Sequence, residues 1–287
     1  MQQHTFKTDS SIRLSIFLRQ NGVSRSLMSY LKTQTLGLTV NGVSAHTDCI
    51  LKPGDIAAIN EPEEYAENAE PNDLKVPILY EDSDVIVYDK PGNMPVHPSA
   101  KHYNDTLLNY HAFYTGGKVF RCLNRLDRDT SGCCLAAKSR YSAAVLSGSI
   151  KKVYLAVTKG IPPESGVIDK PIRRKEGSLI ERECADDGQR AVTHFRRLYT
   201  KDGYSLMQVT IDTGRTHQIR VHFKTIGFPL AGDSLYGGDT SLFKRQALHC
   251  HSLSFTSPDG GEVCVVSEHC LSKDFFGMSL VDIINNA

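Results

Sequence analysis

The sequence predicts an α+β fold, in which a small α/β unit precedes a larger domain built on a mixed, largely antiparallel β-sheet with flanking helices. Two observations predict this. Consecutive strand-like runs joined by short turns recur after residue 75, which favours antiparallel pairing. A segment with six acids and two prolines, residues 61–74, reads as a linker between these runs and residues 1–60. The chain has neither a GxGxxG nor a Walker loop, so nothing supports a nucleotide-cofactor fold.

The first 60 residues are predicted to form a unit of two helices and three short strands. Ser10 or Ser11 could cap the first helix, and Ser24 the second. Alternating residues on both sides of Asn41-Gly42 are a strong hairpin signal, and residues 56–59 form a last strand. After the linker, residues 75–287 are predicted to form one large domain. Its strands are expected at residues 85–88, 133–137, 153–158, 191–198, 205–211, 249–255 and 262–267, and its helices at 107–111, 140–148 and 215–225.

Charge and composition bound the function. The 287 residues carry 33 Lys and Arg against 32 Asp and Glu, so a domain that holds nucleic acid by bulk charge alone is excluded. The net charge is unevenly distributed along the chain. Residues 1–60 carry six basic and three acidic residues, whereas residues 61–74 carry six acids and no base. The acidic segment therefore masks two mildly basic blocks.

The eight cysteines are scattered without a CxxC or zinc-finger spacing, which is typical of a reduced, cytoplasmic protein. The tail gathers several His and Cys residues, but neighbours in a strand point to opposite faces, so we expect no metal site there. Those residues are His249, Cys250, His251, Cys264, His269 and Cys270. No signal peptide and no run of about 18 apolar residues is visible, so we expect neither secretion nor a membrane span.

Three segments could carry chemistry. In Arg125-Leu-Asp-Arg-Asp-Thr-Ser-Gly132, an extended backbone would project Arg125 and Asp127 to the same side, although the segment also reads as a plain solvated turn. In Lys151-Lys-Val-Tyr-Leu-Ala-Val157, Tyr154 lies on the face opposite to its apolar neighbours, as a half-exposed strand tyrosine also would.

The third segment is Gly214-Arg-Thr-His-Gln-Ile-Arg-Val-His222. A helix capped by Asp212 or Thr213 would place Arg215 and Ile219 on one face. An arginine in the first turn is disfavoured by the helix dipole, which suggests a carboxylate or phosphate partner for Arg215; a tolerated surface arginine is the alternative.

Together these segments resemble the RluA-type pseudouridine synthase family. The resemblance covers about residues 76–270 and includes Asp89-Lys-Pro-Gly-Asn-Met-Pro-Val-His-Pro98, interpreted as the KPxG motif, a Pro-Leu-Ala-Gly-Asp-Ser-Leu-Tyr-Gly segment at 229–237 and Gln246-Ala-Leu-His249. Residues 1–60 resemble an S4-type RNA-binding domain through Val-Ser-Arg-Ser-Leu at 23–27, Val-Asn-Gly at 40–42 and Lys-Pro-Gly-Asp at 52–55.

The resemblance implies an enzyme that isomerises uridine in RNA to pseudouridine without a cofactor or metal. It assigns the essential aspartate to Asp127, an arginine partner of that carboxylate to Arg215, and a tyrosine packed against the uracil to Tyr154. It also places Ile219 in the wall of the base pocket. Arg125 would contact RNA near the flipped nucleotide, and Arg128 is a further expected substrate contact.

Some features depart from the family pattern or leave alternatives open. Asn124 stands where the family often has His before the RLD motif, and Cys133-Cys134 follow the motif as small apolar strand residues. The expected partner is RNA, with large-subunit ribosomal RNA favoured over tRNA, and the protein is expected to be a monomer. The alternatives are a non-catalytic RNA-binding or ribosome-assembly protein on the same scaffold, and a glycosidase that pairs Asp127 with Asp129.

Overall fold

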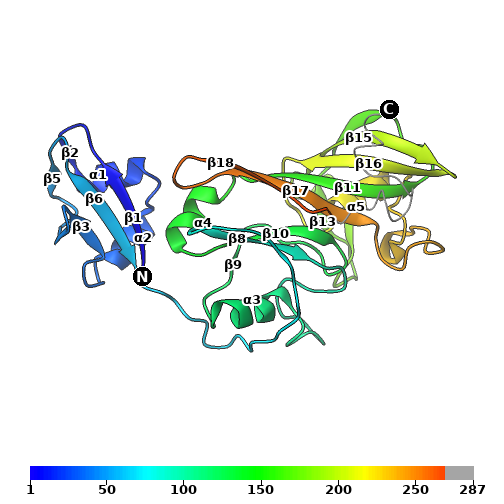
Figure 1. Ribbon diagram of the computed structural model, residues 1–287. Helices are drawn as coiled ribbons and strands as arrows, with labels where there is room; N and C mark the ends of the chain where they lie inside the picture. The colour runs from blue at the N-terminus through cyan, green and yellow to red at the C-terminus, as the bar shows by residue number, and fades with distance from the viewer. Residues whose placement is uncertain (269–287) are drawn as a thin grey trace.

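A computed structural model describes residues 1–268 and places a four-stranded sheet near the N-terminus beside a ten-stranded sheet that organises the rest of the chain (Figure 1). The small sheet has the order β1-β6-β3-β4, with β2 paired to β5 at its side. Its elements are β1 (Gln2–Lys7), β2 (Ile12–Arg13), α1 (Leu14–Gln20), α2 (Arg25–Leu31), β3 (Leu38–Val40), β4 (Val43–Ser44), β5 (Ile50–Leu51) and β6 (Ile56–Glu61). We call these residues, 1–61, the front unit.

Local sequence explains two of these elements. The Ser24 side chain accepts a hydrogen bond from the Leu27 amide at 3.1 Å, so α2 begins where its cap predicts. Asn41 and Gly42 both have positive φ, which suits the two-residue turn that joins β3 to β4. Helix α1 differs from the prediction: it follows Arg13 rather than Ser10 or Ser11, because the preceding residues pair with β5 instead of entering the helix.

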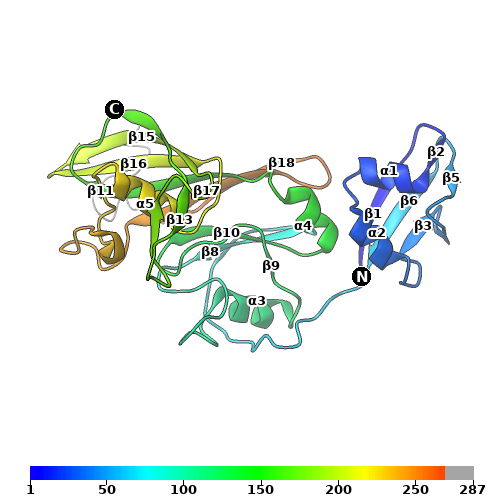
Figure 2. The same cartoon turned by 180° about the vertical axis from the view of Figure 1, so that it is seen from behind.

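The large sheet has the order β12-β15-β16-β11-β17-β10-β8-β7, with β18 added to β17 and β9 to β10. Its strands are β7 (Ile78–Glu81), β8 (Val85–Lys90), β9 (Arg121–Cys122), β10 (Ser131–Ala137), β11 (Lys151–Lys159), β12 (Ser165–Asp169), β15 (Val192–Lys201), β16 (Tyr204–Ile211), β17 (Leu248–Thr256) and β18 (Glu262–Val266). The helical elements are α3 (Leu107–Thr115), α4 (Arg140–Leu146), α5 (Gln218–Thr225) and the 3₁₀ turn Ser234–Tyr236, and a separate hairpin joins β13 (Ile172–Arg174) to β14 (Arg182–Cys184). Figure 2 shows the same arrangement from behind.

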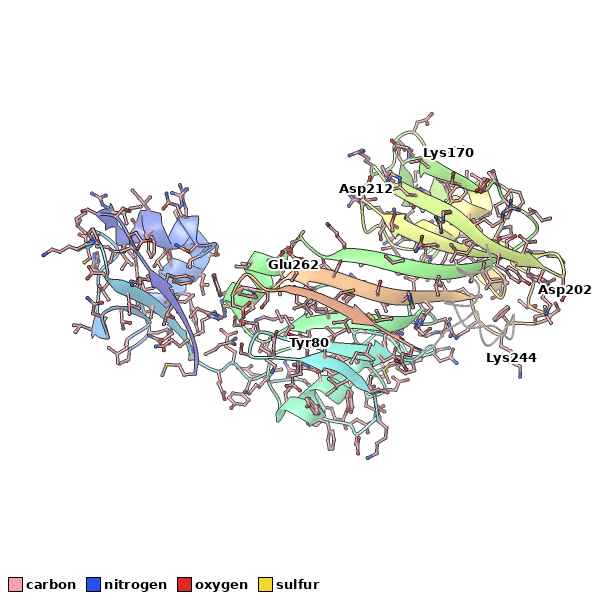
Figure 3. All side chains as sticks on the ribbon, turned by 45° about the horizontal axis from the view of Figure 1, so that its top comes forward. Tyr80, Lys170, Asp202, Asp212, Lys244 and Glu262 are labelled. Carbon is pink, nitrogen blue, oxygen red and sulfur yellow. The ribbon has the colours of Figure 1, made fainter. Side chains whose placement is uncertain are left out.

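The predicted mixed, largely antiparallel sheet is confirmed. Every neighbouring pair of the large sheet is antiparallel except β10 with β17, which run parallel through the pairs Ser131 with His249 and Gly132 with Cys250. The hairpin β15–β16 turns at Asp202, and Figure 3 shows Asp202 and Glu262 at opposite ends of the sheet. Helix α5 begins three residues later than predicted, at Gln218, which changes the functional site as described below.

The acidic segment lies against the larger unit. Its backbone pairs with residues 117–119 through hydrogen bonds from Ala66 to Gly117 and from Val119 to Glu64. The Glu64 carboxylate lies between two guanidinium groups, those of Arg121 and Arg140. The segment connects the two units, and Glu63 and Glu64 form ion pairs with bases of the larger one.

Helix α4 joins the front unit to the larger one. The Glu61 carboxylate, at the end of β6, accepts hydrogen bonds of 3.0 Å from the amides of Arg140 and Tyr141 at the start of α4. The ring of Tyr141 is buried in the apolar cluster of the front unit, and its hydroxyl donates to the Asn21 carbonyl. The two units are therefore joined by shared apolar packing as well as by hydrogen bonds.

The parallel pair β10–β17 leaves room for a hydrogen atom alone at Gly132. Its φ is +106°, and a Cβ there would lie 2.2 Å from the Cys250 carbonyl oxygen. Both facts exclude larger residues, because side chains rarely adopt this φ and the neighbouring backbone cannot move without breaking the sheet. Because Gly132 has no side chain, the end of the segment Arg125–Gly132, which we call the motif segment, can pair with β17 in the sheet.

We expect Gly132→Ala to lower the thermal midpoint by roughly 5–10 °C, because strain and overlap together cost about 3 kcal/mol. Gly148→Ala is the matched control, since Gly148 has φ +88° but no atom within 4 Å of its hypothetical Cβ. Differential scanning calorimetry measures both variants. Equal shifts in the two would mean that the contact with β17 contributes nothing.

Candidate active site

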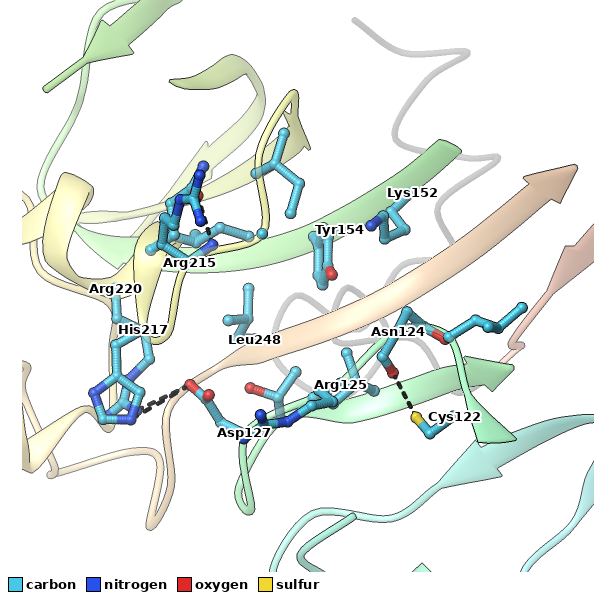
Figure 4. Close-up of a pocket in the computed structure, with 17 residues that line it drawn as sticks. Cys122, Asn124, Arg125, Asp127, Lys152, Tyr154, Arg215, His217, Arg220 and Leu248 are labelled. Atoms are coloured by element: carbon cyan, nitrogen blue, oxygen red, sulfur yellow. Dashed lines mark hydrogen bonds and ion pairs between the residues drawn. The ribbon is translucent and has the colours of Figure 1, made fainter. Parts of the chain in front are cut away.

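A pocket of about 310 Å³ opens between the motif segment, β11 and the start of α5 (Figure 4). This volume is at the lower end for small-ligand pockets and suits one planar ring with its attached groups. The pocket is lined by Cys122, Leu123, Asn124, Arg125, Leu126, Asp127, Thr130, Lys152, Tyr154, Ile211, Gly214, Arg215, His217, Gln218, Ile219, Arg220 and Leu248. Segments about 90 residues apart in sequence thus meet at one site.

The loop that carries Asp127 is fixed by a buried lysine. Lys90, at the end of β8, is fully buried, and its Nζ donates to the carbonyl oxygens of Pro91, Met94 and Arg128 at 2.7, 2.7 and 3.0 Å. Burial lowers the pKa of this ammonium to about 8. The Thr130 amide also donates to the Asp127 carbonyl, which closes a turn around the carboxylate. Three carbonyl acceptors for one cation make this a rigid support.

Asn124 has a structural role in the same loop. Its Nδ2 donates to the Cys133 carbonyl at 2.9 Å and its Oδ1 accepts from the Leu135 amide at 2.7 Å. The side chain is 4% exposed. The amide therefore pairs with the backbone of β10 and holds the loop to the sheet.

Asp127 forms its ion pair with Arg220. Arg220 Nη1 lies 3.0 Å from Asp127 Oδ2, while Nε and Nη2 of the same guanidinium bind both oxygens of Asp233 at 2.7 and 2.9 Å. Burial opposes the charge on Arg220, but its hydrogen bonds and attraction to Asp233 and Asp127 outweigh burial and raise its pKa. Arg220 stays charged and holds the Asp127 carboxylate in one orientation.

The expected pairing of Arg215 with Asp127 is wrong. Arg215 is exposed and precedes α5, and its Nε donates to the Arg190 carbonyl at 3.1 Å. The Gln218 side chain accepts from the Arg215 amide and from Thr213, and His217 adopts φ +57° as the residue before the helix. The helix therefore starts at Gln218, so Arg215 and Ile219 are not successive positions on one helical face. Arg215 still borders the pocket.

Tyr154 and Ile219 supply apolar walls. Tyr154 is 6% exposed and projects from β11 on the face opposite to Leu155 and Val157, as alternation predicts. Burial raises the pKa of its phenol well above the usual value, so the hydroxyl remains protonated at neutral pH. Ile219 is 5% exposed and also lines the pocket. Lys152 lies two residues before Tyr154 and enters the same pocket (Figure 4).

The two arginines of the motif segment differ. Arg125 borders the pocket, is exposed, and forms no side-chain hydrogen bond or ion pair within residues 1–268. Arg128 does not line the pocket, and its guanidinium pairs with Asp129 at 2.9 Å. Within residues 1–268, Asp127 is the only acidic residue that lines this pocket, so none of these residues supplies the second pocket carboxylate that a glycosidase pair requires.

His217 was not among the residues singled out from the sequence. Its Nδ1 lies 2.8 Å from the hydroxyl of Tyr236, and its Nε2 lies 3.9 Å from Asp127 Oδ2 (Figure 4). The signal for His217 and Arg220 was present in the Gly214–His222 segment. It required knowing where the helix begins, because that start decides which side chains face Asp127.

The structure gives no metal cluster to this site. Within residues 1–268, no three His, Cys, Asp or Glu side chains gather as metal ligands. The sequence analysis expected no metal site among the His and Cys residues of the tail. Two of these, His269 and Cys270, lie outside the described residues. No helix in the described part of the chain is long and apolar enough to cross a membrane.

Comparison with known proteins identifies the arrangement. Residues 84–225, which include the motif segment, Tyr154 and Arg220, match the RNA pseudouridylate synthase family. A Bacillus subtilis protein described as an uncharacterized RNA pseudouridine synthase, YjbO, is 39% identical over 250 residues, covering 83% of this chain and 88% of that protein. The chain belongs to the RNA pseudouridine synthase family.

Other relatives agree with this assignment. Ribosomal large subunit pseudouridine synthase D of Xanthomonas campestris is 34% identical over 246 residues, covering 78% of this chain and 74% of that protein. The solved structure of human RNA pseudouridylate synthase domain containing 1 shares the fold, with a TM-score of 0.61 and 23% identity over 75% of this chain and 95% of that one. This pseudouridine synthase is therefore an isomerase that acts on RNA.

The bridging role of Arg220 can be measured through stability. We expect Arg220→Lys to lower the free energy of unfolding by about 2 kcal/mol, because an ammonium cannot make the two-pronged contact with Asp233 and also reach Asp127. Arg215→Lys, the matched control, should change it by less than about 0.5 kcal/mol, as for an exposed side chain. Urea unfolding compares the two, and equal losses would contradict the assignment of the pair to Arg220.

Proposed function

We propose that this pseudouridine synthase modifies specific uridines in structured RNA, with large-subunit ribosomal RNA as its substrate class and Asp127 as the essential carboxylate. The observation that carries the role of Asp127 is its place in the pocket, beside apolar walls and bound to Arg220. The substrate class is supported by relatives whose names specify the large ribosomal subunit.

The pocket geometry supports a flipped nucleotide. A uracil inside a folded RNA is stacked, so it must leave the stack to reach Asp127, at a cost of about a few kcal/mol. Tyr154 and Ile219 offer apolar surface to the ring in return. Arg125, Lys152 and Arg215 line the same pocket as cations and can bind the phosphates on either side of the extruded nucleotide.

The chemistry begins at the sugar. Isomerisation breaks the bond between N1 of the uracil and C1′ of the ribose and forms a bond between C5 and C1′. In the process C5 releases its hydrogen as a proton and N1 takes up a proton. An Asp127 carboxylate beside the sugar can stabilise positive charge at C1′, attack that carbon, or remove a ribose proton. Arg220 fixes the carboxylate for each of these roles, and Tyr154, whose hydroxyl stays protonated, lines the pocket that would hold the uracil ring.

The front unit is the proposed second RNA contact, in keeping with its resemblance to S4-type domains. Arg13, Arg19, Arg25 and Lys32 are exposed on or beside its two helices. Because α4 joins this unit firmly to the larger one, contacts here would set the position of the RNA relative to the pocket. Few such contacts predict a moderate dependence of affinity on salt.

We expect Asp127→Asn to lower pseudouridine formation by roughly 10³-fold or more, because the amide can neither attack C1′ nor accept a proton as a carboxylate does. Asp129→Asn is the control, since Asp129 lies in the same motif but outside the pocket. Both are incubated with ribosomal RNA and tRNA, and pseudouridines are mapped. Modification of tRNA alone would contradict the substrate class, and RNA binding without any pseudouridine would indicate a non-catalytic RNA-binding protein.

The double substitution Arg19→Glu with Arg25→Glu should weaken RNA binding by roughly 10-fold or more at moderate salt, because it replaces two cations near the phosphates with anions. The single-turnover rate at saturating RNA should stay the same, since the pocket is unaltered. Filter binding and rapid-quench kinetics give the two values. Unchanged affinity would remove the front unit from the RNA-binding surface.

A further inference from the structure

His217 is a polar residue of the pocket to which the proposed chemistry of Asp127 assigns no role. His217 lines the pocket with its side chain 15% exposed, and its backbone occupies the left-handed region at φ +57°. That conformation is strained for a non-glycine residue. Its side chain makes no capping hydrogen bond to α5, so helix capping does not explain the histidine.

The hydrogen bonds around Tyr236 determine which ring nitrogen of His217 carries the proton. Tyr236 is 3% exposed, and its oxygen accepts a hydrogen bond from the Arg182 amide at 2.9 Å. Its own proton needs an acceptor, and among the described residues the recorded one is His217 Nδ1 at 2.8 Å. Nδ1 is therefore unprotonated, and the neutral ring carries its hydrogen on Nε2.

The surrounding groups keep this ring neutral. Burial lowers the pKa of His217 below its usual value of 6.5, and the positive charges of Arg220 and Arg182 act in the same direction. Asp127 and Asp233 oppose this shift without reversing it. Because the folded-state pKa is lowered, the neutral ring dominates at pH 7 and above, and protonation begins only on acidification.

His217 lines the pocket, and its Nε2–H donates no hydrogen bond to any of residues 1–268. Asp127 Oδ2 lies 3.9 Å from Nε2, beyond hydrogen-bond distance, and that oxygen already accepts a hydrogen bond from Arg220. A donor on a pocket wall is satisfied by an acceptor on the bound ligand or by water. Uracil offers two carbonyl oxygens as acceptors, and Asp127 places the ribose next to this donor.

We propose that His217 is a catalytic hydrogen-bond donor, whose neutral Nε2–H binds a carbonyl oxygen of the uracil as the ring detaches. When the C1′–N1 bond breaks, its electron pair moves to N1 and spreads onto the carbonyl oxygens. A fixed donor at such an oxygen stabilises the developing charge. The proton stays on Nε2 throughout, so the histidine is regenerated without a transfer step. The inference rests on the proposed pseudouridine chemistry of Asp127.

A matched pair of amide variants tests the donor. In His217→Gln the side-chain NH₂ reaches about as far as Nε2, whereas in His217→Asn the same amide is one methylene shorter. Asparagine tolerates the left-handed backbone well, so His217→Asn should fold. We expect His217→Asn to reduce the single-turnover rate by about 100-fold, and His217→Gln by no more than about 10-fold, with RNA affinity within about threefold of the original.

A structural readout that does not depend on activity accompanies the kinetics. ¹⁵N spectra of the histidine side chains at pH 7.5, with His217 assigned by its loss in His217→Gln, should show the tautomer protonated at Nε2. An Nδ1-protonated or doubly protonated ring would overturn the proposal, and so would equal rates for the two variants when their thermal midpoints match the original. Failure of the unaltered protein to form pseudouridine would instead overturn the proposed function, and this inference with it.

Discussion

The guanidinium of Arg220 is the constraint on which the site depends. It lies on α5, is 6% exposed, and binds Asp233 with two prongs and Asp127 with a third. Two buried or partly buried carboxylates and one cation stabilise each other only when all three are present, because each charge pays a desolvation cost that the others offset. Through Arg220, the Asp127 carboxylate is held in place relative to α5 and to Asp233.

The motif segment that carries Asp127 is also held in place by neighbouring residues. Lys90 donates a hydrogen bond to the Arg128 carbonyl of this segment, and Asn124 donates one to the backbone of β10. Gly132 allows β10 to approach β17. Lys90 is fully buried and Asn124 nearly so, and we assign neither a part in the chemistry. They act by removing freedom from the backbone around Asp127, which is how enzymes prepare a carboxylate before the substrate arrives.

Much of this could be predicted from local sequence. Alternation placed Tyr154 on the pocket face of β11, caps placed the starts of α2 and α3, and turn residues placed the β3–β4 and β15–β16 hairpins. Strand β1 was missed because its partly buried positions include Gln2 and His4, so its inward face does not read as apolar. The arginine partner of Asp127 was misplaced because the start of α5 is fixed by the Gln218 side chain and by the backbone of His217. Such side-chain hydrogen bonds form only in the folded structure, so helix periodicity in the sequence could not predict where α5 begins.

The insertion of Tyr141 into the core of the front unit has a consequence for selectivity. The front unit is joined to the larger one through α4 and the Glu61 carboxylate, so the distance from its exposed helices to the pocket is set by the fold. If the front unit binds RNA as proposed, the protein acts as a ruler. A uridine would then be selected by how far it lies, in three dimensions, from a second feature of the folded RNA, and identical local sequences at other distances would be passed over.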